Sequence, residues 1–532
     1  MEKMNRRDFI RFAGGVTVSS FVVPDALFAN SGGDLPNDFK ALVVVDLQGG
    51  NDALNMFIPT DKSSGSDIGY EKYAKARTDA VRIKDNDLMG DLRARVDSNG
   101  YLDLSASGAP YNENNNLEAS YTKGYYLLDK NGFESKVGVN AMMPEVAYWL
   151  DRGKGAIVQN VGSIAQPATK DDLLSGRLPS PPFNFAHDQQ ATLMKTGQAS
   201  SINIPTGWLG RVADKWSDLF TGGAYKMNIN LSTYGQYKMF FGNETMPMSY
   251  SSKGPVDYGD SYLGWYDGSN RTYLRTSRLA LRKEMADMND GDMFRKLSAS
   301  TEKAIIEQVE QTVADWDSVS GENNIFDGLT DSYGNSFVQS DGETTLIPST
   351  TQLNIGNVRF RSIDPFMTAA KLIHIGKNKG FKRMVIAITL GGYDQHSTQS
   401  TTHSAKIREL SLGVDRLMRF MEAKGYMDSV TMFTVSEFAR TLGSNSNGTD
   451  HAWGGAYMVL GGAVRSGNYG TFPSLTLGGA DDLGDKGRFV PTTSYSQYFG
   501  TILKWFGADA EVLDHALPEL KNFSTKDLGF MG

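Results

Sequence analysis

The chain has 532 residues, a formal net charge of −8, no cysteine and a hydrophobic content of 40%, which is enough for a substantial core. Its acidic balance and the lack of a long basic run argue against nucleic acid as a partner, because phosphate binding needs clustered Lys and Arg. Without cysteine no disulfide can form, and any metal site must use His, Asp, Glu and other oxygen ligands.

The first 29 residues have the pattern of an export signal. The adjacent Arg6 and Arg7 precede a weakly apolar stretch over residues 12–23, and Ala29 is a small residue suited to a cleavage site. The paired arginines resemble a twin-arginine signal, which exports folded proteins. A short anchor helix is the alternative, but the apolar stretch has about half of the roughly 20 residues that span a bilayer. We expect a periplasmic or secreted protein with no stable membrane span after removal of the signal.

Residues 38–215 are expected to form the first part of an α/β core. The continuous apolar run Ala41–Asp46 predicts a strand covered on both faces. A polar stretch over residues 61–133 predicts long loops. Pro144–Arg152 then predicts a short helix and Gly155–Gly162 another strand, as in a βαβ unit with a long insertion in its crossover.

Residues 216–356 lack a regular alternation of strand and helix patterns, and we interpret them as a cap inserted into the core. Asn228–Met248 and Ser336–Asn354 predict polar strands and loops. Lys303–Val319 predicts an amphipathic helix whose apolar face indicates packing. The acidic run Asp287–Asp292 suggests a calcium loop, but it lacks the glycine offset and the final Glu of an EF-hand and is interpreted as a solvated turn.

Residues 357–532 form the second part of the core and alternate most clearly. The predicted helices and strands are Pro365–Ile375, Met384–Leu390, Ala405–Lys424, Val430–Val435, Ala456–Leu460 and Tyr495–Phe506. This alternation predicts an α/β fold, with a mostly parallel sheet sandwiched by helices. The strands that end at Asp46, Leu390 and Val435 are expected to be neighbours or near-neighbours whose carboxyl ends point the same way.

Polar runs lie at or near the ends of these predicted strands. Carboxylates and histidines at such strand ends are where an open α/β sheet builds its site, and they are the usual ligands of zinc and manganese. The sequence therefore predicts a metal site at this edge. Its candidate ligands are Asp46, Asp394, His396, Glu437, Asp450 and His451.

These residues also have structural interpretations that the sequence leaves open. Asp394 could cap a following helix, with His396 on the surface. Glu437 at a strand end is costly unless it is paired, hydrogen-bonded or bound to metal. Arg440 is then either its ion-pair partner or an anion clamp.

Further candidates lie in a glycine-rich turn and on two histidines. Backbone N–H groups of Gly49, Gly50 and Asn51 could bind an anion, or the turn could be only structural. His187 could be a metal ligand, a general acid or a structural histidine. His403 lies beside a helix and is expected to be solvated. No spacing identifies a Ser or Thr nucleophile.

Several of these runs, in this order, resemble the DUF1501 family of exported, largely uncharacterised bacterial proteins. The runs are Leu47–Asp52, Thr206–Arg211, Gly391–Ser397, Glu437–Thr441 and Thr449–Gly455. That family is grouped with the alkaline-phosphatase-like superfamily, which includes sulfatases, so the resemblance implies a parallel α/β sandwich with metal at the strand ends. Two positions depart from the family pattern: Ala186 where many relatives carry Ser, and Gln395 where they usually carry Thr.

Together the residues and the resemblance favour an exported metal-dependent hydrolase of phosphate or sulfate esters or related anionic groups. Divalent ions, zinc or manganese, would polarise the ester oxygen of a small or polymer-linked substrate and activate a nucleophile or water. His187 is a candidate catalytic residue, and Arg440 and the glycine turn would steady the anion. The rival is a non-catalytic exported protein that acts in binding or cell-surface assembly, which Ala186 and the polar insertion favour.

Overall fold

The computed structural model describes residues 36–532 apart from residues 95, 97–99, 101, 103–116, 182–184, 221–225, 232–236, 256–271, 289–292, 333, 335 and 338–362. The expected signal over residues 1–29 lies outside the described residues, as do the last part of Asp287–Asp292 and most of Ser336–Asn354. Across the described ranges, no helix is both long enough and apolar enough to cross a membrane.

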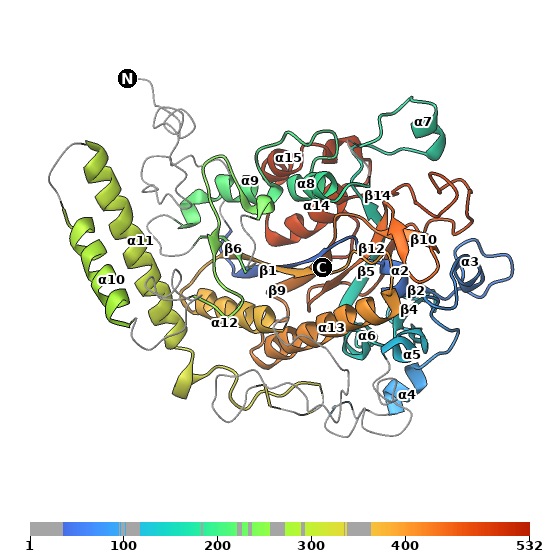
Figure 1. Cartoon of the computed structure of the whole chain (residues 1–532), viewed down its shortest axis with the longest axis horizontal. Coiled ribbons are helices and arrows are strands. Elements are labelled where there is room, and N and C mark those ends of the chain that lie inside the picture. Colours follow the sequence, from blue (N-terminus) through green and yellow to red (C-terminus); the bar gives the residue numbers. More distant parts are fainter. Residues whose placement is uncertain are drawn as a thin grey trace.

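A mostly parallel sheet runs through the centre of the molecule (Figure 1). Its strand order is β13-β5-β12-β9-β1-β8-β6-β7, with β14 paired to β5. The strands are β1 (Lys40–Gln48), β5 (Gly155–Gly162), β6 (Asn228–Asn230), β7 (Met248–Ser249), β8 (Arg383–Gly391), β9 (Val430–Val435), β12 (Gly455–Leu460), β13 (Gly467–Gly470) and β14 (Thr493–Ser494).

The three strands predicted to be neighbours lie side by side. β1 pairs in parallel with β8 on one side and β9 on the other, and Asp46 is the register partner of both Thr389 and Val435. The prediction for these strands is confirmed. Their carboxyl ends meet at one edge of the sheet, where the polar runs follow.

The strand predicted at Ala456–Leu460 is present as β12, but it runs antiparallel to β9 and β5. No crossover helix separates β9 from β12. The chain instead forms the antiparallel hairpin β10 (Arg440–Ser444) and β11 (Thr449–His451). After the hairpin the chain enters β12 at the same edge of the sheet where β9 ends. The hairpin is therefore held against the carboxyl ends of the parallel strands.

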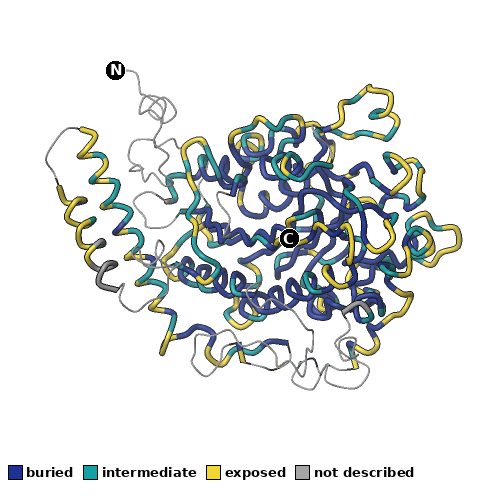
Figure 2. Tube along the Cα trace, viewed as in Figure 1, coloured by how far each residue is buried: buried dark blue, intermediate teal, exposed yellow. Residues whose placement is uncertain are grey.

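Helices cover both faces of the sheet (Figure 1). Alternate β1 side chains face opposite ways: Val43 and Val45 pack into the core cluster under one set of helices, and Leu42 and Val44 into the cluster under the other. The first set comprises α6 (Pro144–Asp151), α12 (Asp364–Asn378) and α13 (Gln399–Ala423), and the second α8 (His187–Thr196), α9 (Trp208–Lys215), α14 (Tyr495–Phe506) and α15 (Ala510–Ala516). Each fully buried aliphatic side chain contributes about 1.5–3 kcal/mol. The strands are accordingly the most continuously buried part of the trace (Figure 2).

The stretch over residues 61–133, predicted as long loops, contains regular structure. Its elements and their neighbours are α2 (Ala53–Met56), α3 (Tyr70–Ala76), α4 (Met89–Ala94), α5 (Leu117–Thr122) and a small sheet of β2 (Phe57–Pro59), β4 (Val137–Asn140) and β3 (Tyr125–Leu128). Widely spaced tyrosines anchor it: Tyr73, Tyr121 and Tyr125 are buried. The loop prediction was wrong because the polar composition hides these few aromatic anchors.

The segment expected to be an inserted cap divides into two parts. β6 and β7 extend the central sheet beyond β8, so this part belongs to the core and not to a cap. The helices α10 (Thr272–Ala286) and α11 (Met293–Asp317) form a hairpin that projects at the edge of the molecule (Figure 1). The sequence did not predict β6 and β7 as core strands, because strands of three and two residues show little hydrophobic periodicity.

Candidate metal centre

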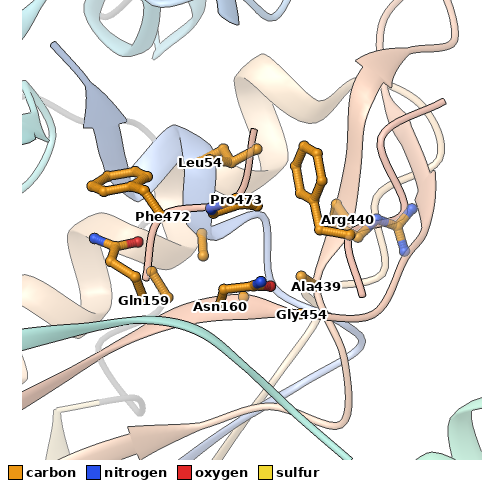
Figure 3. Close-up of a pocket in the computed structure, with 12 residues that line it drawn as sticks. Leu54, Gln159, Asn160, Ala439, Arg440, Gly454, Phe472 and Pro473 are labelled. Atoms are coloured by element: carbon orange, nitrogen blue, oxygen red, sulfur yellow. The ribbon is translucent and has the colours of Figure 1, made fainter. Parts of the chain in front are cut away.

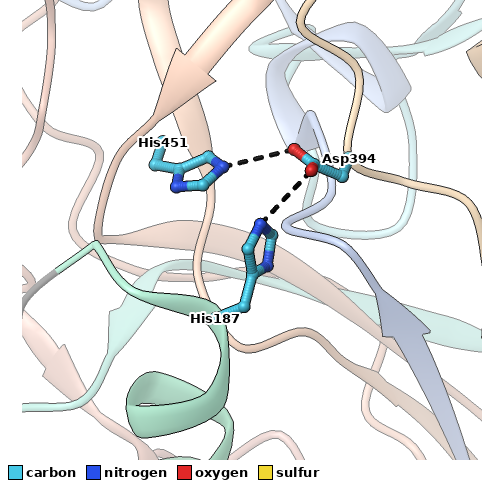
Figure 4. A group of neighbouring side chains, drawn as sticks. All are labelled: His187, Asp394 and His451. Carbon is cyan, nitrogen blue, oxygen red and sulfur yellow. Dashed lines mark hydrogen bonds and ion pairs between the residues drawn. The ribbon is translucent and has the colours of Figure 1, made fainter.

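Four side chains from three segments of the chain meet beyond the carboxyl ends of β1, β8 and β9. Asp394 and His396 come from the loop after β8, His451 ends β11, and His187 opens α8. Figure 4 shows three of them pointing toward one another, with the Nε2 atoms of His451 and His187 at 3.2 and 3.4 Å from the two oxygens of Asp394. His396 Nε2 lies 2.9 Å from Asp394 Oδ1 and 3.0 Å from His451 Nε2.

This spacing suits a shared ion. One ligand atom from each of His187, Asp394 and His451 lies within 4.8 Å of the others. Zinc binds histidine nitrogen and carboxylate oxygen at roughly 2 Å, so two ligands of one ion lie within about 4 Å of each other. The pairs of Asp394 with His451 and His187, at 3.2 and 3.4 Å, meet this limit, and the full set needs only a small closure. The distance between His396 and His451 is also within this reach.

Two of the histidines are oriented through their other ring nitrogen. His187 Nδ1 lies 2.9 Å from Glu437 Oε1, and His451 Nδ1 lies 2.8 Å from the carbonyl oxygen of Phe185. Since both partners only accept hydrogen bonds, each Nδ1 carries a proton, and a neutral ring then presents a lone pair at Nε2. The hydrogen bond to Glu437 raises the pKa of His187, so a metal ion at Nε2 would have to displace a proton. The Nε2 of His187 is shielded from solvent and makes no hydrogen bond. It is a metal-type donor atom without a hydrogen-bond partner, 3.4 Å from Asp394 Oδ2.

Glu437, a predicted ligand, lies behind His187 in this arrangement. Its side chain is 4% exposed, and Oε1 accepts hydrogen bonds from His187 and from the N–H of Gly49 at 2.9 Å. Burial raises the pKa of the Glu437 carboxyl, but the bonds from His187 and the backbone outweigh burial, and the pKa is lowered overall. An ionised Glu437 can therefore hold the proton on His187.

The backbone N–H groups of Gly49 and Asn51 in the glycine turn donate to groups of the protein, Glu437 among them, and not to a free anion site. Gly49 has φ +123°, and a Cβ there would lie 2.3 Å from the backbone nitrogen of Asp394, so the close approach requires glycine. At Gly50 a Cβ would meet the Phe438 ring. The N–H of Gly49 is bound to Glu437, and that of Asn51 donates to Ser436 Oγ at 3.0 Å. These two N–H groups are not available to an anion as predicted.

Arg440 pairs with Asp394, not with Glu437. Its side chain is fully buried, with Nη1 at 2.9 Å from Asp394 Oδ1 and Nη2 donating to the carbonyl of Thr449. Burial raises the pKa of Asp394, but Arg440 and His451 outweigh it, and the carboxyl pKa is lowered. Arg440 therefore keeps Asp394 ionised, and its contacts to the protein argue against a free anion clamp.

The remaining two predicted ligands differ in position. Asp450 lies behind His396, with Oδ1 at 3.5 Å from His396 Nδ1 and accepting from Asn445 Nδ2 at 2.7 Å. Asp46 is fully buried and contacts Lys195, whose Nζ lies 3.2 Å from Asp46 Oδ2. Asp46 therefore borders the cluster without an ion pair to its histidines.

A small pocket adjoins the other side of Arg440 (Figure 3). Leu54, Gln159, Asn160 and Phe472 line it, and the Arg440 guanidinium is directed away from it. Asn160 Nδ2 donates to Val490 O at 2.9 Å. The charged groups thus gather on the histidine side of Arg440 and not in this pocket.

His403, expected to be solvated, is fully buried. Its Nε2 lies 2.9 Å from Asn51 Oδ1 and its Nδ1 2.9 Å from the hydroxyl of Tyr121, so it supports the turn beneath Glu437. The prediction was wrong. The signal that could have found it is its helical spacing ahead of the buried Ile407 and Leu410 on α13.

This burial predicts a dependence of stability on pH. Burial lowers the pKa of His403 to about 4, whereas an unfolded histidine titrates near about 6.5. Between these values the unfolded state binds more protons, so His403 lowers the free energy of unfolding as pH falls. His403→Gln should reduce the slope of the free energy of unfolding against pH by up to about 1.4 kcal/mol per pH unit. Urea unfolding of both proteins at pH 7, 6 and 5 measures it, and equal slopes would contradict the assignment.

The family follows from comparison with known proteins. Residues 350–513 match the model of a family described as protein of unknown function, DUF1501. Over this segment the chain is similar to the DUF1501 family. The matched segment carries Asp394, His396, Glu437 and His451, and the family prediction is confirmed. The motifs around Gly49 and His187 lie outside the matched segment.

Two solved structures resemble this protein weakly. They are Ps i-CgsB in complex with k-i-k-neocarrahexaose, at 10% identity and a TM-score of 0.29, and Ps i-CgsB itself, at 11% and 0.28. Each comparison covers 71% of both chains. No curated protein matches the chain. With TM-scores this low, the structures carry no argument, and the function must be argued from the site.

Proposed function

We propose that this protein is an exported, divalent-metal-dependent hydrolase of phosphate or sulfate esters or related anionic groups. The observation that carries the proposal is the unpartnered Nε2 of His187, which faces Asp394 beside two further imidazole nitrogens. Three imidazoles and one carboxylate are a donor set that zinc and manganese accept. His187, Asp394 and His451 would hold the ion, with His396 beside them.

A bound divalent ion would supply a Lewis acid and a water of lowered pKa. The chain's own residues would hold this arrangement: Glu437 keeps the proton on Nδ1 of His187, and Arg440 keeps Asp394 ionised. The side chain of His396 is 48% exposed, so an anionic ester would approach from its side. The strand-end position of the site and the family resemblance support an alkaline-phosphatase-like fold as part of this proposal.

One observation favours the non-catalytic alternative. Among the described residues, no hydroxyl hydrogen-bonds to His187, Asp394 or His451. Ala186, at the N-cap of α8, offers no side-chain oxygen. A hydrolase of this kind would therefore use water as its nucleophile.

Metal content and turnover test the proposal together. Protein purified from the periplasm and loaded with zinc or manganese should retain about one ion per chain at the His187 cluster and hydrolyse members of a panel of phosphate and sulfate esters. Retained metal without turnover would support the binding alternative. Protein that retains no ion after loading would overturn the metal site itself.

Export has its own test. Arg6 and Arg7 should be required for twin-arginine recognition, so the double substitution Arg6→Lys and Arg7→Lys should hold the precursor in the cytoplasm. Immunoblots of periplasmic and cytoplasmic fractions measure the distribution. Substitution of Lys3 by Arg is the matched control and should leave export unchanged. Normal periplasmic appearance of the double variant would remove the assignment.

A further inference from the structure

Asp46 and Lys195 form a buried ion pair next to the metal centre. Asp46 is fully buried, and neither carboxylate oxygen accepts a well-aligned hydrogen bond. The Lys195 ammonium lies 3.2 Å from Oδ2 and 4.9 Å from the centre of the Tyr237 ring. The Tyr237 hydroxyl is also buried, beside Asp46. A carboxylate in this setting needs a cation, because an unpaired buried charge is costly.

A second carboxylate lies close to this pair. Asp46 is the register partner of Val435 in β9, and Glu437 follows two residues further on. Burial raises the pKa of the Asp46 carboxyl, the charge of Lys195 lowers it, and the charge of Glu437 raises it. Asp46 and Glu437 thus lie on neighbouring strands at one sheet edge, where two carboxylates can supply oxygen donors to a cation. In this chain the ammonium of Lys195 supplies the positive charge.

The position of Lys195 links this pair to the metal centre. His187 opens α8, and Lys195 lies about two turns along the same helix. One helix thus brings an imidazole to one end of Glu437 and an ammonium to Asp46. Glu437 Oε1 is occupied by His187 and Gly49, while Oε2 accepts from Ser436 Oγ at 3.2 Å.

We propose that the Lys195 ammonium takes the place of a second metal ion at Asp46 and Glu437. The native chain then binds a single divalent ion, and loss of Lys195 opens a second site beside the first. With carboxylates and a phenol oxygen as its donors, the new site would favour manganese or magnesium. The inference rests on the proposed function only for the first ion.

The test is the stoichiometry of manganese, measured by equilibrium dialysis and elemental analysis. Wild-type protein should bind one equivalent and Lys195→Ala two. Lys195→Arg keeps the charge and should bind one. Lys195→Ala combined with Asp46→Asn should return to one. Lys215→Ala, which removes a half-buried lysine paired with Glu511, is the matched control and should also bind one.

The outcomes separate the two proposals. A gain of one equivalent in Lys195→Ala over wild type supports the inference even if wild type binds none, which would defeat the proposed function alone. Equal stoichiometry in folded Lys195→Ala and wild type would overturn the inference. If the variant unfolds on purification, its melting temperature is compared with and without manganese. Recovery with manganese that also requires Asp46 supports the second site, and no recovery overturns it.

Discussion

Asp394→Asn is expected to abolish metal binding and any hydrolysis by this protein together. Asp394 is the carboxylate that lies within 3.4 Å of the Nε2 atoms of all three clustered histidines. Asparagine keeps the shape but removes the charge that attracts the ion, so we expect at least about a 100-fold loss of metal affinity, the upper range seen for groups behind the ligands. Dialysis against buffered zinc or manganese, followed by elemental analysis, measures the loss.

Stability gives a second readout of the same variant. An ion at about 100 times its Kd stabilises the folded state by about 2.7 kcal/mol, so a chelator should lower the Tm of wild-type protein. It should leave the Tm of Asp394→Asn unchanged. Glu437→Gln is the informative companion, because it acts through His187 and should cost about 10–100-fold in affinity.

The competing explanation is that Arg440 alone compensates Asp394. Wild-type protein would then bind no metal, chelator would leave its Tm unchanged, and Arg440→Met would be more damaging than His451→Ala. If metal compensates, His451→Ala should lower both the metal content and the Tm. The two sets of results cannot both occur.

Much of the site could be predicted because strand ends are local features of a sequence. A continuous apolar run followed by polar residues places Asp394 and Glu437 at one sheet edge once β1, β8 and β9 are neighbours. The antiparallel hairpin that presents His451 also follows directly from β9. These positions depend on short-range connections, and the sequence encodes them within a few residues.

The roles within the site depended on long-range packing that no local pattern contains. His187 reaches Glu437 only because α8 packs on the face of the sheet that also buries Asp46. The same packing delivers Lys195 to Asp46, which turns a predicted ligand into an ion-pair partner. His403 supports the turn at Asn51 from the opposite face. Such contacts join residues separated by 149 (195 − 46) to 352 positions.

The second large effect is expected at the buried pair of Asp52 and Arg77. Their side chains are 3% and 0% exposed, and two hydrogen bonds join them. Gln399 donates a hydrogen bond to Asp52 and accepts one from the Thr449 hydroxyl. The same hydroxyl accepts a hydrogen bond from Arg440, so a chain of hydrogen bonds joins this ion pair to the metal centre. Asp52→Ala would leave the Arg77 guanidinium buried without a counter-charge. We expect a loss of about 3–5 kcal/mol in the free energy of unfolding.

Urea unfolding with a double-variant cycle measures this loss and its cause. Arg77→Met alone should also destabilise, since it leaves Asp52 unpaired. The double variant Asp52→Ala with Arg77→Met should cost less than the sum of the two single variants, because it leaves no buried charge. Asp79→Ala is the matched control: the Asp79 side chain is 87% exposed in its pair with Arg82, so its loss should cost only about 0–1 kcal/mol. If Asp52→Ala lowers the free energy of unfolding no more than Asp79→Ala does, the Asp52–Arg77 pair does not anchor the turn at residues 49–52. The metal centre would then owe its geometry to His403 and Ser436 instead.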